Sequence, residues 1–234
     1  MSSETGAEQP DLSLYDRAVV EHGLYGAARS RMLVELTTDK PWQARLDTGS
    51  VTFGDETYDA QILGTHSERD DTFLWAWANP GAAQWGPSLE AANALRARGE
   101  KPGYAVFSER KVAGEWVRFR ELSWVAGELS GERAVHFADA GNGTTAVMLI
   151  DGGPTNMDEF PLVFLPGVVL GFQSETALPM RACLARFLER LGFTVEHEDA
   201  AVLGSRADGN SLKVELDVEG RVTKVQLKVQ AARR

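Results

Sequence analysis

The sequence predicts an α+β protein, a single domain in which antiparallel sheets pack with helices. Short runs of alternating or apolar residues are separated by turns that contain glycine, asparagine and aspartate, which is typical of antiparallel hairpins. Other segments repeat their apolar residues at intervals of three and four, which is typical of helices. Helical and hairpin segments follow one another in separate runs, which favours the α+β class. The segments with helical spacing are residues 13–36, 88–98, 120–129 and 174–191.

Size and composition are those of an ordinary globular protein. The chain has 234 residues, of which 43% are hydrophobic and 25% charged, so it can bury a sizeable core. Cys183 is the only cysteine, which excludes an internal disulfide and a cysteine-based zinc site within one chain. We expect residues 1–10 to be a disordered tail and residues 11–234 to form one domain, with a candidate internal boundary at 151–159.

The formal net charge of −10 narrows the classes of partner. Basic residues cluster only at Arg233-Arg234, so we expect no nucleic-acid partner and no anionic membrane partner. The first ten residues lack the basic and apolar regions of a secretory signal. The longest apolar run, Leu162–Leu170, is too short to cross a bilayer. We therefore expect a cytoplasmic protein, whose acidity suits solubility and also fits a basic protein partner.

The N-terminal segment is predicted to be one helix. Asp11 or Ser13 would cap it, and the helical spacing ends near Leu36. Gly23 and Gly26 weaken its middle, so the helix is expected to bend or break there.

An antiparallel meander is predicted to follow this helix. Apolar and polar residues that alternate between glycine-containing turns indicate strands at about 42–46, 51–53 and 57–66. The charged segment Ser67–Asp71 is a hairpin loop that leads into a fourth strand. A short helix then covers about residues 88–98.

The fourth strand, Thr72–Asn79, is the most distinctive segment of the chain. Side chains in an extended chain alternate between two faces. One face would carry Phe73, Trp75, Trp77 and Asn79, and the other would carry one leucine and two alanines. Because both faces are apolar, the pattern predicts an interior strand that is covered on both sides.

The pattern is less regular beyond residue 100. Tyr104–Phe107 has the composition of a strand, and residues 111–119 are ambiguous, although Gly114 favours a hairpin there. The Asn-Gly turn at 142–143 predicts a hairpin whose strands lie near 133–137 and 145–150.

The C-terminal part begins with an apolar segment of uncertain type. Phe160–Phe172 contains two prolines and two glycines, so a buried strand and a core-lining loop both fit. Ser174 would cap a long helix that Gly192 ends. Residues 212–229 alternate strictly, which predicts a hairpin with one packed and one solvated face.

The first meander resembles a bacterial family of unknown function that is marked by a Trp-x-Trp-Ala-Asn strand. The resemblance rests on Trp42, Gly49–Phe53, Ile62–Ser67 and Phe73–Asn79. It covers about residues 12–100 and is looser beyond them. Phe73 and Thr65 stand where the family is expected to have Trp and Ser. The family carries no established activity, so the resemblance implies no catalytic residue.

Sequence motifs of common catalytic and metal sites do not occur. We find no phosphate-binding loop, no Gly-x-Ser-x-Gly elbow and no His-Glu-x-x-His pair. His197 and Asp199 have the spacing of one arm of a metal site, but a solvated acidic turn explains them better. Cys183 lies beside the apolar face of its helix, which favours a packed side chain over a reactive thiolate. We therefore expect no catalytic residue, no metal site and no cofactor.

Aromatic residues supply the candidate site of the sequence. Packing in the core is the favoured explanation for the large side chains between Trp42 and Trp85, because aromatic residues dominate core burial. The alternative is a concave aromatic pocket with Asn79 at its rim. The candidate ligand-binding residues are then Trp75, Trp77, Asn79 and Trp85.

These observations predict a non-catalytic binding or protein-interaction module. The alternative is a small-molecule-binding protein or an enzyme that uses an aromatic pocket around Trp75, Trp77 and Asn79. An open cavity beside these residues would favour the alternative, whereas a closed and dry contact would exclude it.

Overall fold

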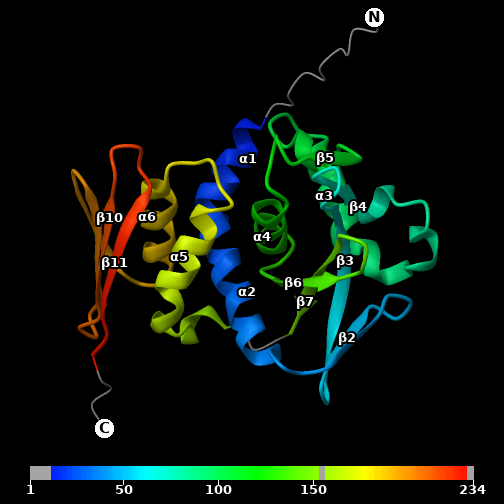
Figure 1. The fold of residues 1–234 in the computed structure, drawn as a ribbon, viewed down its shortest axis with the longest axis horizontal. Coiled ribbons are helices and arrows are strands. Elements are labelled where there is room, and N and C mark those ends of the chain that lie inside the picture. Colours follow the sequence, from blue (N-terminus) through cyan, green and yellow to red (C-terminus); the bar gives the residue numbers. More distant parts are fainter. Residues whose placement is uncertain (1–11, 153–155, 231–234) are drawn as a thin grey trace, which may run out of the picture.

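Helices lie between two antiparallel sheets in the computed structural model, which describes residues 12–152 and 156–230 (Figure 1). The helices are α1 (Ser13–Ala18), α2 (Leu24–Thr37), α3 (Glu90–Gly99), α4 (Phe119–Leu129), α5 (Leu165–Gln173) and α6 (Met180–Arg190). The larger sheet contains β1 (Trp42–Arg45), β2 (Ser50–Phe53), β3 (Glu56–Ser67), β4 (Thr72–Trp75), β5 (Lys111–Ala113), β6 (Ala134–Asp139) and β7 (Thr144–Asp151). The smaller sheet contains β8 (Thr194–Glu198), β9 (Ala201–Ser205), β10 (Ser211–Leu216) and β11 (Val222–Lys228).

The layers follow the order sheet, helices, helices, sheet. Helices α5 and α6 cover the smaller sheet, and α2 and α4 pack on β6 of the larger sheet (Figure 1). Helix α2 also packs against α4 and α5, so the two helical layers are in direct contact. This arrangement is the predicted α+β class with antiparallel sheets. The tail predicted at residues 1–10 lies outside the described part of the chain.

Strand β3 is the centre of the larger sheet. It pairs with β2 and β4 of the predicted meander and with β7 of the later hairpin, in each case antiparallel. Gly49 and Gly54 occupy the predicted turns with positive φ, which glycine adopts without strain. The hairpin predicted around residues 142–143 is confirmed as β6 and β7. Its pairing with β3 is a long-range contact that the local pattern does not predict.

The smaller sheet has the strand order β11, β10, β9, β8. The hairpin predicted at residues 212–229 is confirmed as β10 and β11, in which Val214 lies opposite Val225. Strands β8 and β9 were not predicted. Strand β8 is mostly exposed, so it lacks the alternation of apolar and polar residues that identifies a half-buried strand.

The main apolar core extends through the helices from one sheet to the other. Trp75 on β4, Phe172 on α5 and Val214 on β10 belong to the same cluster of buried side chains. A smaller cluster includes Phe53 and Ile62 of the larger sheet. The main cluster therefore draws on both sides of the candidate boundary at 151–159.

The predicted N-terminal helix is present, with a π-helical turn at Val19–Gly23 between α1 and α2. Close packing explains the two glycines in its middle. A Cβ atom on Gly26 would lie 2.5 Å from the carbonyl oxygen of Trp124, and one on Gly23 would lie 2.7 Å from the ring of Phe172. These glycines let α4 and α5 approach the first helix closely.

The strand predicted at Thr72–Asn79 is wrong beyond Trp75. Strand β4 ends there, and Ala76–Ala78 form a 3₁₀ turn. On one edge, its pairing with β5 covers only Thr72–Leu74. Trp75 is fully buried, and its indole N–H donates to the carbonyl oxygen of Val106 at 3.1 Å. Trp77 and Asn79 therefore do not share a strand face with Trp75.

Three further predictions of local structure are wrong. Tyr104–Phe107 is not a strand, because residues 105–107 form a 3₁₀ turn. The second half of Phe160–Phe172 is neither a strand nor a loop but helix α5. A proline in its first turn is compatible with this helix, since that position needs no N–H donor. The next helix begins at Met180, and Ser174 ends α5 instead of starting α6.

Candidate functional site

The four predicted ligand-binding residues lie in different surroundings. Trp75 lies in the core and has no exposed surface. Trp77 is half-buried, and the guanidinium of Arg96 lies 4.5 Å from the centre of its ring. The side-chain oxygen of Asn79 accepts a hydrogen bond from the backbone N–H of Gly81 at 2.8 Å, which closes a local turn.

Trp85 is half-buried and packs against the smaller core cluster. Neither the apolar cavity nor the acidic cavity described below is lined by Trp75, Trp77, Asn79 or Trp85. A role for these four residues in ligand binding therefore stays a prediction.

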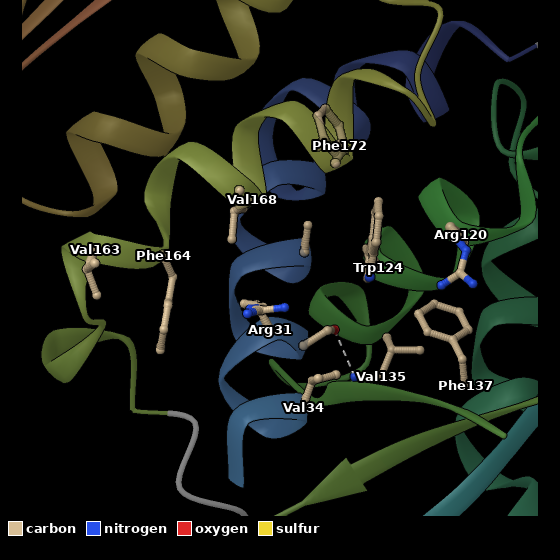
Figure 2. A pocket seen from close by; sticks show the side chains of 14 residues that line it. Arg31, Val34, Arg120, Trp124, Val135, Phe137, Val163, Phe164, Val168 and Phe172 are labelled. Carbon is tan, nitrogen blue, oxygen red and sulfur yellow. Dashed lines mark hydrogen bonds between the residues drawn. The ribbon is translucent and has the colours of Figure 1, made fainter. Parts of the chain in front are cut away.

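An apolar cavity of about 350 Å³ lies between α2, α4, β6 and α5 (Figure 2). We call it the interhelical cavity. Figure 2 shows Trp124 and Phe137 on one side, Phe164 and Val168 on the other, and Val34 of α2 between them. Its walls lie at the junction of the two helical layers and the larger sheet, a type of location that is common for small-molecule sites.

Two glycines of α5 keep the wall of the interhelical cavity open. Gly167 and Gly171 both line it, and a Cβ atom added to either would have no other protein atom within 4 Å. Gly23 and Gly26 differ, because neighbouring backbone or rings occupy the space where their side chains would be. Glycine within a helix is destabilising relative to alanine by roughly 0.5–1 kcal/mol. Both glycines are exposed, so the open space beside them is continuous with the solvent.

Arginine supplies the charged groups of the cavity wall. Arg31 pairs with Glu35 one turn along α2, and its guanidinium lies 5.5 Å from the ring centre of Phe164. Arg120 lies 4.5 Å from the ring centre of Phe137, and its Nε is 3.7 Å from a carboxylate oxygen of Glu175. That distance is longer than a hydrogen bond. The lining contains no acidic side chain, although the whole chain has a net charge of −10.

The polar groups of the cavity wall differ in whether they have hydrogen-bond partners. The hydroxyl of Ser30 donates to the carbonyl oxygen of Gly26 at 2.8 Å and accepts from the backbone N–H of Val135 at 3.0 Å, a contact drawn in Figure 2. Trp124 is 8% exposed, and its indole N–H has no hydrogen-bond partner among the described residues. The indole nitrogen is fully buried, so this donor is closed off from the cavity as well as from solvent.

An acidic cavity of about 500 Å³ lies near the start of α4. Glu121 lines it with only 6% of its surface exposed, and it accepts a hydrogen bond from the hydroxyl of Tyr15 at 3.0 Å. Burial, with smaller contributions from the nearby Asp16 and Glu175, raises the pKa of Glu121 from 4.5 to about 7, although hydrogen bonds from Thr176 and Tyr15 oppose the shift. The hydrogen bond ties α1 to α4, so the described contacts give Glu121 a structural role.

The histidine, acidic and cysteine residues considered in the sequence do not form a site in the described part of the chain. Among residues 12–152 and 156–230, no three His, Cys, Asp or Glu side chains converge as metal ligands, and His197 is exposed on β8. Cys183 is fully buried, and burial raises the pKa of its thiol to about 12. Every helix in the described part of the chain is too short or too polar to cross a membrane.

The residues of the interhelical cavity were missed because the sequence pattern marks them weakly. Arg120 and Trp124 are four residues apart in a segment predicted to be helical, so they could have been placed on one face. Gly167 and Gly171 have the same spacing, but their segment was not recognised as a helix. Arg31 is an exposed helical residue by pattern, and only the packing of α5 brings it to the cavity.

Fold and cavity together define an α+β protein with a cavity of ligand size between its helical layers. The chain belongs to a family of unknown function, DUF6882, whose model matches residues 17–153, more than half of the sequence. The match includes α2, α4 and β6 of the interhelical cavity but ends before α5. Comparison with the curated proteins and with the solved structures finds no match.

Proposed function

We propose that this protein is a non-catalytic cytoplasmic binding protein whose interhelical cavity takes one small, largely apolar molecule. The observation that carries the proposal is the apolar cavity of about 350 Å³, with aromatic side chains and two arginines in its wall. Small-molecule sites have this composition, in which apolar and aromatic walls surround a few polar groups.

The size of the cavity sets the size of the ligand. A cavity of about 150 Å³ accommodates benzene, so the interhelical cavity has room for roughly a dozen non-hydrogen atoms. Each such atom contributes on the order of 0.5 kcal/mol to the binding free energy of a small ligand. A ligand of this size would therefore bind with a Kd on the order of 100 μM.

The two glycines of α5 support an occupant for the cavity. Side chains at Gly167 and Gly171 would fill open space, and they would also favour the helix. Both positions are exposed, and a ligand that lies against the backbone of α5 would use this open space. Glycine is the residue that permits such an approach.

A protein partner is the second candidate occupant. Val163 and Leu170 beside the cavity are 70% and 49% exposed, and Val34 at its wall is 42% exposed. An apolar segment of a partner would cover these side chains, and the net charge of −10 supports a partner that is basic elsewhere. A small ligand is favoured because the cavity is of ligand size.

Calorimetric titration of the wild type and of a blocked variant tests the proposal. Octanoate and octan-1-ol serve as probes with an eight-carbon chain. Gly171→Leu places a side chain in the cavity without meeting protein atoms at its Cβ, so we expect it to abolish binding of both probes. Ala97→Leu on the exposed side of α3 is the matched control and should bind as the wild type does.

Thermal unfolding of both variants shows whether they are folded. The proposal is contradicted if neither probe binds the wild type. It is also contradicted if a folded Gly171→Leu protein binds the probes as tightly as the wild type, because the probes then bind elsewhere.

A further inference from the structure

We propose that the natural ligand is an apolar carboxylate and that Arg120 is the residue that binds its carboxylate group. This inference rests on the proposed function, since it assigns a ligand class to the interhelical cavity. It follows from the charge of the wall and from the unused hydrogen-bonding capacity of Arg120 on α4.

The charge of the cavity wall is opposite to that of the protein. Acidic residues outnumber basic residues by ten over the whole chain. The lining nevertheless contains Arg31 and Arg120 and no carboxylate. The side chain of Arg120 is 40% exposed, so water screens its attraction for a bound anion in part.

The N–H donors of Arg120 are not used by the described hydrogen bonds. A guanidinium group carries five N–H donors, and no described hydrogen bond uses any of those on Arg120. Its single described ion pair, with Glu175, spans 3.7 Å. Phe137 and Phe119 hold the guanidinium in place through their ring faces, with centres at 4.5 and 5.2 Å.

Arginines that stabilise this fold look different. Arg29 donates to Glu128 at 2.8 Å and to Glu132 at 3.0 Å, and Arg190 donates to Glu128 at 3.2 Å. These side chains form a hydrogen-bonded network between helices. Arg120 has no such network, so the described contacts leave its hydrogen-bonding groups for a ligand.

Trp124 lies on the same helix face. It follows Arg120 by four residues, which is about one turn of α4, and both side chains line the cavity (Figure 2). The indole nitrogen of Trp124 is buried beneath that wall, so Trp124 contributes apolar surface and the carboxylate accepts from Arg120. The apolar body of the ligand would then lie along Phe172 and Val168, next to the glycines of α5.

Arg31 is the less suitable cation. It already pairs with Glu35 within α2, and it lies near Phe164, on the other side of the cavity from Phe137 (Figure 2). We therefore assign the carboxylate to Arg120 and a minor electrostatic contribution to Arg31.

Titrations with three eight-carbon probes test the inference. At pH 7.5, octanoate is anionic, octan-1-ol is neutral and octylamine is cationic. We expect octanoate to bind the wild type about tenfold more tightly than octan-1-ol, and octylamine to bind most weakly. Arg120→Gln should make octanoate and octan-1-ol bind equally, and Arg120→Lys should restore part of the preference.

Arg118→Gln is the matched control, because Arg118 lies two residues away and lines the acidic cavity instead. It should keep the full preference for octanoate. Equal binding of octanoate and octan-1-ol to the wild type, or tighter binding of octylamine, overturns the carboxylate assignment and leaves the proposed function standing. A preference that survives in a folded Arg120→Gln protein overturns the role of Arg120. Absence of binding by all three probes contradicts the proposed function itself.

Discussion

Replacing Gly171 by alanine should stabilise the protein. The new methyl group would meet no other protein atom within 4 Å, so it causes no steric strain. Alanine favours a helix over glycine by up to about 1 kcal/mol, partly because it restricts the unfolded chain. Gly171 lies two residues before the end of α5, where this preference is weaker than in mid-helix. We therefore expect a gain of about 0.5–1 kcal/mol in the free energy of unfolding.

Urea unfolding followed by circular dichroism measures this gain, which corresponds to a rise of about 1–3 °C in Tm. Gly167→Ala is an internal replicate, because its added Cβ would also lie in open space. A loss of 1 kcal/mol or more in both variants would refute the reasoning. The space beside α5 would then be filled by protein atoms, and the interhelical cavity would not exist as described.

Three further predictions concern packing, buried charge and pH. Gly26→Ala should destabilise the protein by roughly 1–3 kcal/mol in urea unfolding, because its Cβ would lie 2.5 Å from a carbonyl oxygen of α4; an unchanged midpoint would contradict this contact. Glu128→Ala should cost about 3 kcal/mol, since it removes the buried carboxylate shared by Arg29 and Arg190 and leaves only the more exposed Glu132 to pair with both, and a cost below 1 kcal/mol would show that the network is dispensable. The pKa of Glu121 is raised from 4.5 in the unfolded chain to about 7 in the folded chain, so the folded chain binds the proton more tightly. The stabilisation from this proton is complete below pH 4.5 and disappears as the pH rises through about 7. Wild type should therefore lose about 3 kcal/mol relative to Glu121→Gln over that range, and parallel pH profiles of the two proteins would exclude the buried carboxyl as the cause.

Strong local signals predicted much of the fold. The hairpins at Gly49, Gly54 and residues 142–143 are marked by turn residues whose conformation few others adopt, and all three are present. The helix at 120–129 was placed within one residue, since its apolar side chains share one face and Gly131 follows it. These features depend only on neighbours in sequence.

Features that depend on distant contacts were not predictable. The pairing of β7 with β3 brings together residues that lie more than seventy positions apart, such as Gly64 and Val147. The spacing of apolar residues along the chain gives no information about such long-range contacts. Helix α5 was missed for a related reason, because its two glycines and its proline contradict helix propensity and tertiary packing outweighs them.

The candidate site illustrates the same limit. The composition of Trp75–Asn79 suggested an aromatic pocket, but the early end of β4 separates its side chains. The interhelical cavity is built from residues on four elements that meet only in the fold. The spacing of Arg120 and Trp124 was visible in the sequence, yet nothing nearby indicated that a cavity lies beside them.

A crystal structure of the protein grown with octanoate tests the central claim most directly. We predict density for the ligand in the interhelical cavity, with its carboxylate within hydrogen-bond distance of Arg120 and its chain along Gly167 and Gly171. A structure in which the side chains of Phe164 or Trp124 close the cavity, or in which octanoate binds only elsewhere, would contradict the account.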